Sequence, residues 1–296
     1  MDAAGSAVKR ALEVLVAVTA MSAVRAAQAD PPAAGSTTRG LAACASDPES
    51  GVPVRVPITG PADFGVLPEA CPATSVAARG RAAILVAERD YYGSLFAGAA
   101  LAGRVAVGNG VWLSLWAPGP EYRFVANATV EQDSADLSAG TLGVHVPLEV
   151  DRRLVVAPYG RVLIPTETVL SRGTRTGIEQ GLSAVVRLGD RVELVGGWAF
   201  PLLFTDGGAS VRTLFAPAVS TDIVLRPFRA LAIAAGAAVR VVPSDPDPLE
   251  SVDPRASLRL YPWRGTFVDV SGALPLGGRD RSDVAAAIAL GWIWSR

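Results

Sequence analysis

The chain has 296 residues, half of them hydrophobic, with a formal net charge of −1 and a pI of about 5.9. This slightly acidic balance gives no electrostatic basis for binding nucleic acid. Mean hydropathy is +0.34, yet beyond the N-terminus no run approaches the ~20 apolar residues that a spanning helix needs. An apolar surplus without a helical span favours a membrane protein built from strands.

The N-terminal residues are typical of an export signal. Lys9 and Arg10 precede an apolar stretch from Leu12 to Val24, and Ala27-Gln28-Ala29 supplies small residues for cleavage. We therefore expect residues 1–29 to be a cleaved signal peptide. An uncleaved inner-membrane anchor is the alternative.

Residues 30–80 are rich in Pro, Ala, Gly and Ser and show no sustained period. This composition predicts an irregular periplasmic lead segment; a small plug inside a barrel is compatible with it but not implied. Cys44 and Cys71 are the only cysteines, and in an oxidising compartment they are expected to form one disulfide. Two thiolates and a distant His145 are too few ligands for a metal site, and we expect no cofactor.

Apolar and polar residues then alternate with period two to the end of the chain, which predicts β-strands. The alternation is clearest between Arg175 and Leu203, around a turn at Gly189-Asp190. One face of this hairpin carries Arg175, Glu179, Ser183, Arg187, Arg191 and Glu193, and the other carries Ile178, Leu182, Val186, Leu194, Trp198 and Phe200. Arms of roughly 10 to 14 residues, tilted near 45°, span the ~25 Å apolar band of an outer-membrane barrel.

About twelve such arms are predicted, an even number that agrees with single-chain barrels. They lie near residues 81–91, 95–106, 110–130 (interrupted around Pro118 and Pro120), 137–149, 153–165, 175–188, 191–204, 210–225, 229–242, 252–262, 265–275 and 283–294. Short turns at 108–110, 151–152, 189–190, 226–229 and 262–265 alternate with longer polar connections near 131–136, 166–174, 243–251 and 276–282. This asymmetry is typical of short periplasmic turns and long extracellular loops.

Aromatic residues gather near the ends of the predicted arms, as an aromatic girdle would. The predicted periplasmic group is Trp292, Trp294, Trp263, Phe228 and Tyr261, and the outer group is Trp198, Phe200 and Phe204. Packing within hairpins is the competing interpretation of both groups. The acidic connection near 243–251 fits no EF-hand spacing, so we interpret it as a solvated loop rather than a calcium site.

With this alternation, these turns and a last arm ending AAAIALGWIWSR, residues 81–296 resemble the bacterial outer-membrane β-barrel superfamily. The resemblance implies an all-β, antiparallel, up-and-down transmembrane barrel of about 12 strands, surrounded by outer-membrane lipid and inserted by the barrel-assembly machinery. Members usually end in an aromatic residue, whereas Ser295 and Arg296 follow Trp294 here. No motif identifies a subfamily.

The charged face of each arm is expected to point inward, because an arginine on the lipid face at mid-membrane costs ~2 to 4 kcal/mol. The predicted lumen-lining residues are His145, Glu149, Arg153, Arg161, Arg175, Glu179, Arg187, Arg191, Glu193, Arg212, Asp222, Arg240, Arg259 and Asp269, together with Arg104, Tyr159, Arg226 and Arg255. Arginines outnumber carboxylates in this set, which favours a passive channel for small solutes or anions. A structural barrel whose lumen is filled by a ladder of salt bridges is the equal alternative.

Two other classes of function stay open. A few barrels of the outer membrane are lipid hydrolases or deacylases that use a Ser-His pair. His145 shares its face with Thr141 and Glu149, but no serine of that arm does, so we expect no enzyme. A soluble exported β-sandwich or adhesin is the second alternative.

Overall fold

The computed structural model describes residues 70–71, 74–87, 92–107, 110–126, 131–166, 174–206, 211–241, 249–263, 265–274, 276 and 284–294. The predicted signal peptide, its cleavage site and Cys44 lie outside these residues. Within the described ranges, no helix is long and apolar enough to cross a membrane.

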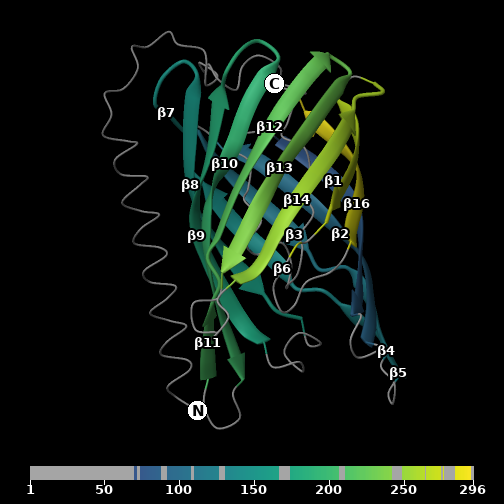
Figure 1. Cartoon of the computed structure of the whole chain (residues 1–296). Helices are drawn as coiled ribbons and strands as arrows, with labels where there is room; N and C mark the ends of the chain where they lie inside the picture. The colour runs from purple at the N-terminus through teal and green to yellow at the C-terminus, as the bar shows by residue number, and fades with distance from the viewer. Residues whose placement is uncertain are drawn as a thin grey trace.

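The described residues form antiparallel strands that wind around a single barrel (Figure 1). The strands are β1 (Thr74–Ala87), β2 (Tyr92–Val107), β3 (Val111–Ala117), β4 (Pro120–Ala126), β5 (Glu131–Leu137), β6 (Gly140–His145), β7 (Leu148–Glu149), β8 (Leu154–Ile164), β9 (Thr174–Arg187), β10 (Val192–Asp206), β11 (Val211–Phe215), β12 (Ala218–Phe228), β13 (Leu231–Val241), β14 (Leu249–Leu260), β15 (Thr266–Ala273) and β16 (Val284–Trp294). Interrupted strands count once in the wall, so the barrel has 12 strands, as predicted.

The sheet closes because β1 pairs with both β2 and β16. Closure leaves no edge along these strands and satisfies their backbone groups without water. It also shows that the β-sandwich alternative is wrong. The tight connections, such as those between β9 and β10 and between β12 and β13, share one end of the barrel with the end of β16, at the top of Figure 1. We call this the short-turn end and the opposite one the long-loop end.

Alternation along each strand decides which side chains enter the interior. In β8, Val155, Ala157, Tyr159, Arg161 and Leu163 are buried, and the residues between them are more exposed. The predicted hairpin obeys the same rule: Glu179, Ser183 and Glu193 are buried, while Trp198 and Phe200 are exposed. Its register, with Glu193 opposite Arg187 and Trp198 opposite Leu182, places each face as the sequence predicted. The polar face therefore points into the barrel and the apolar face points outward.

Two neighbouring wall strands break at the same level. The break between β3 and β4 falls at Pro118 and Gly119, where the sequence predicted an interruption, and the break between β5 and β6 falls at Ser138 and Ala139. Gly119 and Ser138 bridge the two breaks through hydrogen bonds of 2.8 Å and 2.9 Å. A Cβ on Gly119 would lie 1.8 Å from the Ala99 carbonyl oxygen, so only glycine fits there. Beyond the breaks, β4 and β5 extend past the wall at the lower right of Figure 1.

Several expected boundaries differ from the observed ones. β1 begins at Thr74, where the sequence suggested a start near residue 81, and β14 begins at Leu249 inside the expected loop. The predicted connection near 131–136 is wrong, because Glu131–Leu137 forms β5 and pairs with β4. In the predicted girdle, Trp263, Phe228 and Trp292 are exposed, but Tyr261 is buried against Phe267, Ala77 and Ala289. Tyr261 therefore belongs to the interior.

Candidate functional site in the barrel interior

The interior is lined by small side chains between charged ones. Small inward residues include Ala157, Ser183, Ala199, Ala218, Ser220, Ser271 and Ala289, all of them buried. The charged residues buried among them are Glu121, Arg161, Glu179, Glu193, Asp222, Arg240, Asp253, Arg259 and Asp269. Buried charges are tolerated only where they are paired and hydrogen-bonded, so their pairing decides how the interior behaves.

The most enclosed ion pair joins β14 to β15. The Arg259 guanidinium donates from Nε and Nη2 to the two Asp269 carboxylate oxygens, at 2.5 Å and 2.7 Å, and both side chains are 1% exposed. The guanidinium also lies 4.4 Å from the ring centroid of Phe267. This bidentate geometry is the strong form of an arginine–carboxylate contact.

A second bidentate pair crosses a whole strand. Arg255 of β14 donates to both Asp222 oxygens of β12 at 2.7 Å, although β13 lies between them. Gly236 of β13 occupies the position between the two side chains, and a Cβ there would lie 2.5 Å from Asp222 Oδ1. Glycine at this position therefore leaves room for the pair.

Two further pairs stand on the adjoining wall. Arg226 Nη2 donates to Glu193 Oε2 at 2.9 Å, and Arg161 donates to Glu179, which also accepts a hydrogen bond from the Tyr159 hydroxyl at 3.0 Å. All of these pairs join neighbouring or next-neighbouring strands. The charges of these interior arginines are thus largely cancelled by carboxylates.

An aromatic cluster holds the histidine. The imidazole of His145 stacks on Trp112 with ring centroids 3.6 Å apart and lies 5.5 Å from the ring of Tyr159. Its Nε2 is 2.8 Å from the Ser114 hydroxyl oxygen. Ser114 comes from the neighbouring strand, so a search for serines within the histidine's own arm could not find it.

This Ser-His contact gives no support to a lipid hydrolase. The pair faces the interior rather than the apolar outer surface, and His145 is fully buried. Its Nδ1 has no hydrogen-bond partner among the described residues, whereas a catalytic imidazole is oriented by a third group at that nitrogen. Nor do three or more potential metal-ligating side chains gather within the described ranges.

Two further cation–π contacts lie on the wall opposite the ion pairs. The Arg79 guanidinium lies 4.9 Å from the ring centroid of Trp116, and that of Arg104 lies 5.7 Å from Trp112. Arg104 also donates from Nε to the Ser75 hydroxyl at 3.2 Å. Trp112, Ser114 and Trp116 share one parity, which is the signal that could have placed them inside.

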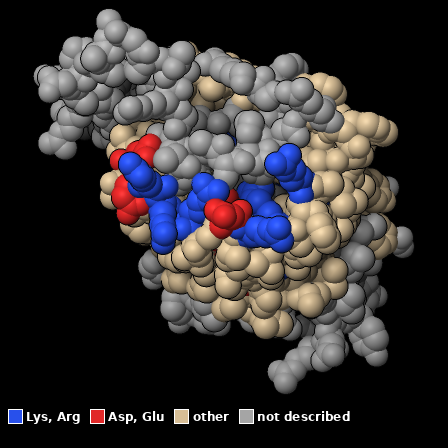
Figure 2. Space-filling model, turned by 90° about the horizontal axis from the view of Figure 1, so that it is seen from above, with Lys and Arg blue, Asp and Glu red and all other residues tan. Residues whose placement is uncertain are grey.

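Four other predicted lumen residues lie at the short-turn end. Glu149, Arg153 and Arg191 are exposed there, and the Arg187 side chain is 23% exposed, with Nη2 3.7 Å from Asp190. These residues therefore line the rim rather than the enclosed interior. The side chains of Arg175 and Arg212 lie outside the described part of the structure. Figure 2 views this end and shows arginines and carboxylates gathered along one side of it.

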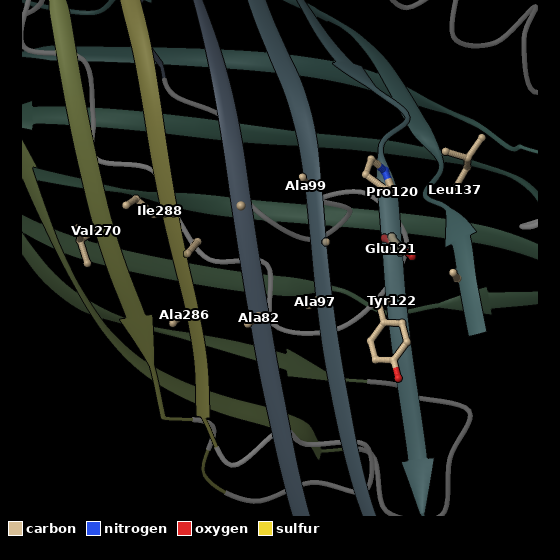
Figure 3. Close-up of a pocket in the computed structure, with 14 residues that line it drawn as sticks. Ala82, Ala97, Ala99, Pro120, Glu121, Tyr122, Leu137, Val270, Ala286 and Ile288 are labelled. Atoms are coloured by element: carbon tan, nitrogen blue, oxygen red, sulfur yellow. The ribbon is translucent and has the colours of Figure 1, made fainter. Parts of the chain in front are cut away.

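A hollow of about 1010 Å³ lies on the barrel wall, across β15, β16, β1, β2, β4 and β5. In Figure 3, Val270 and Ile288 stand on one side of it and Tyr122 and Leu137 on the other, with alanines between. Val270 and Ile288 are each 52% exposed, while their chain neighbours Asp269 and Ala289 are buried. The hollow therefore belongs to the outward, apolar face and not to the interior path.

No protein-family model matches the sequence, and no curated protein matches it. Among solved structures, an outer membrane channel from Pseudomonas putida F1 is similar at 10% identity and TM-score 0.52, over 80% of this chain and 100% of that one. The translocator domain of the autotransporter NalP from Neisseria meningitidis is similar at 9% identity and TM-score 0.52, over 74% and 88%. The NanC porin matches at 9% identity and TM-score 0.46, over 76% and 100%. The chain has the fold of the bacterial outer-membrane β-barrels.

Proposed function

We propose that the protein lies in the bacterial outer membrane and is a passive channel for small solutes, with a preference for anions. The observation that carries this proposal is a closed barrel of 12 strands with small and paired polar side chains inside and apolar side chains outside. A barrel of this size lies between eight-stranded barrels, which side chains fill, and sixteen-stranded porins, which leave a water channel. The charged rim at the short-turn end supports the passage of small ions. No enzymatic step enters the proposal.

We assign the anion preference to the rim of the barrel at the short-turn end. Inside, the ion pairs described above cancel most of the charge of their arginines, so the predicted interior surplus of arginine contributes little. Among the described residues of the short-turn end, the arginines Arg152, Arg153, Arg187, Arg191 and Arg229 outnumber the carboxylates Glu149, Asp151 and Asp190. The Asp151 carboxylate is held at the turn, because it accepts hydrogen bonds from the backbone amides of Arg153 and Leu154 at 2.6 Å and 2.9 Å. A positive mouth with low-dielectric walls concentrates anions.

The test is the reversal potential of the refolded protein in a planar bilayer under a salt gradient. We expect small anions to pass more readily than small cations, and the preference to weaken as salt rises. Replacing Arg187 and Arg191 by Gln should reduce the preference, while the same two positions changed to Lys, which keep their charge, should retain it. Absence of conductance, or cation selectivity, would refute the channel and leave a closed barrel held by its salt bridges.

The partners that this proposal implies are outer-membrane lipid, small solutes and the barrel-assembly machinery. The exposed apolar residues of β16, among them Val284, Ile288, Leu290 and Trp292, form the surface that would face lipid. Export through the predicted N-terminal signal is part of the same proposal.

A further inference from the structure

An apolar patch lies on the inward face of the barrel near the short-turn end. It consists of Val155, Ala157, Val185, Val195, Val224, Ala232 and Ala234, contributed by β8, β9, β10, β12 and β13, and no member is more than 5% exposed. Each strand supplies these residues within a few positions of its short-turn end. Inward positions of a water-filled barrel are normally polar. An inward apolar patch therefore needs something to cover it.

Two residues from the segment before β1 pack on this patch. Ala70 is fully buried within the cluster, and Cys71, which is partly buried, packs against it. Both come just before β1, which stands on the opposite side of the barrel, between β16 and β2. The chain must therefore leave the wall at Thr74 and enter the lumen to reach the patch.

The dimensions agree with this path. Twelve strands spaced ~4.8 Å and tilted ~40° give a barrel about 24 Å across. The four steps from Thr74 to Ala70 reach at most ~14 Å. Ala70 thus stands well out from the β1 wall, in the cross-section through which a solute would pass.

We infer that the Ala70–Cys71 turn is a constriction seated in the lumen at the short-turn end, docked on this apolar patch. Its effect on solute flow rests on the proposed channel function, whereas its position does not. The two can be separated by measuring position and conductance in the same proteins.

The experiment places a charge at Ala70. It then measures how accessible a residue beneath the turn has become and how well the barrel conducts. A buried carboxylate or guanidinium without a partner disfavours the docked position by about tenfold or more. The reporter is a cysteine introduced as Val195→Cys. In Ala70→Asp and Ala70→Arg it should react about tenfold faster with a water-soluble maleimide than in protein that keeps Ala70. Single-channel conductance of the same two variants should rise about twofold or more. Ala230→Asp is the matched control, since Ala230 is exposed in the β12–β13 turn at the same end. It should leave the labelling rate unchanged and should not raise the conductance.

Each outcome decides the matter. Rapid labelling of Val195→Cys in otherwise unchanged protein, or labelling that neither Ala70 variant accelerates, would overturn the constriction. Conductance that rises with one sign of charge and falls with the other would also overturn it, because electrostatics rather than displacement would then explain the change. Faster labelling with no conductance in any of the proteins would keep the constriction and refute the channel. Heat-modifiable gel mobility confirms that each variant is folded, and either Ala70 variant suffices if the other fails.

Discussion

Of the ion pairs described above, the buried Arg259–Asp269 pair should destabilise the barrel most when it is broken. Asp269→Ala leaves the Arg259 guanidinium without the carboxylate that accepts its two hydrogen bonds of 2.5 Å and 2.7 Å, in a place where both side chains are 1% exposed. Breaking a buried pair in this way costs about 3 to 5 kcal/mol. Replacing both partners by apolar residues, as in Arg259→Met with Asp269→Leu, removes the unpaired charge and should cost far less.

The assay is the free energy of unfolding in urea, followed by tryptophan fluorescence of the protein in lipid vesicles. Asp190→Ala is the control, because the Arg187–Asp190 pair is 3.7 Å long and the Asp190 side chain is fully exposed; it should produce no measurable change. If Asp269→Ala costs less than about 1 kcal/mol, the pair is bathed in water and the interior at this level is not enclosed. If the double variant is as unstable as the single one, packing rather than charge explains the loss.

Two further predictions concern the wall and the lead segment. Leu290→Arg should destabilise the barrel more than Val284→Arg, by on the order of 1 to 3 kcal/mol, because Val284 begins the last strand at the long-loop end and Leu290 lies deeper in the apolar band; equal folding yields in vesicles would contradict this depth. Cys44 and Cys71 should be joined in the exported protein, so unreduced protein should not react with thiol reagents, and rapid labelling at both positions would contradict the pairing.

Most strands and their faces could be predicted because apolar and polar side chains alternate with period two along them. The β9–β10 hairpin shows why: a slip of one residue would turn Glu179 and Glu193 to the outside and Trp198 to the inside. β5 escaped prediction because its sequence, EQDSADL, has no apolar face and reads as a loop. It is a strand because β4 offers it a partner.

Depth along the barrel could not be predicted from alternation. Parity assigned Arg153, Arg187 and Arg191 to the charged face, but parity does not say how near the rim a residue lies. Arg187 and Arg191 flank a tight turn, and that proximity to the end of the strand places them at the mouth.

The contacts of the site could not be predicted, because they depend on which residues of neighbouring strands lie opposite each other. A single sequence does not give this register. Ser114 meets His145 across strands, 31 positions away along the chain, and Asp222 meets Arg255 across an intervening strand. The position of Ala70 could not be predicted for another reason. The proline-rich sequence around it has no period, so it gives no indication of which residues Ala70 contacts.

Orientation relative to lipid is tested most directly by fluorescence quenching with bromine-labelled acyl chains. Two variants are compared in vesicles, each retaining one tryptophan: Trp198, which is 45% exposed on the outward face, or Trp112, which is 1% exposed inside. Bromine quenches only on close approach, so Trp198 should be strongly quenched and Trp112 should not. Equal quenching of the two, or quenching of neither in protein shown to be folded, would contradict a barrel that crosses the membrane with its apolar face outward.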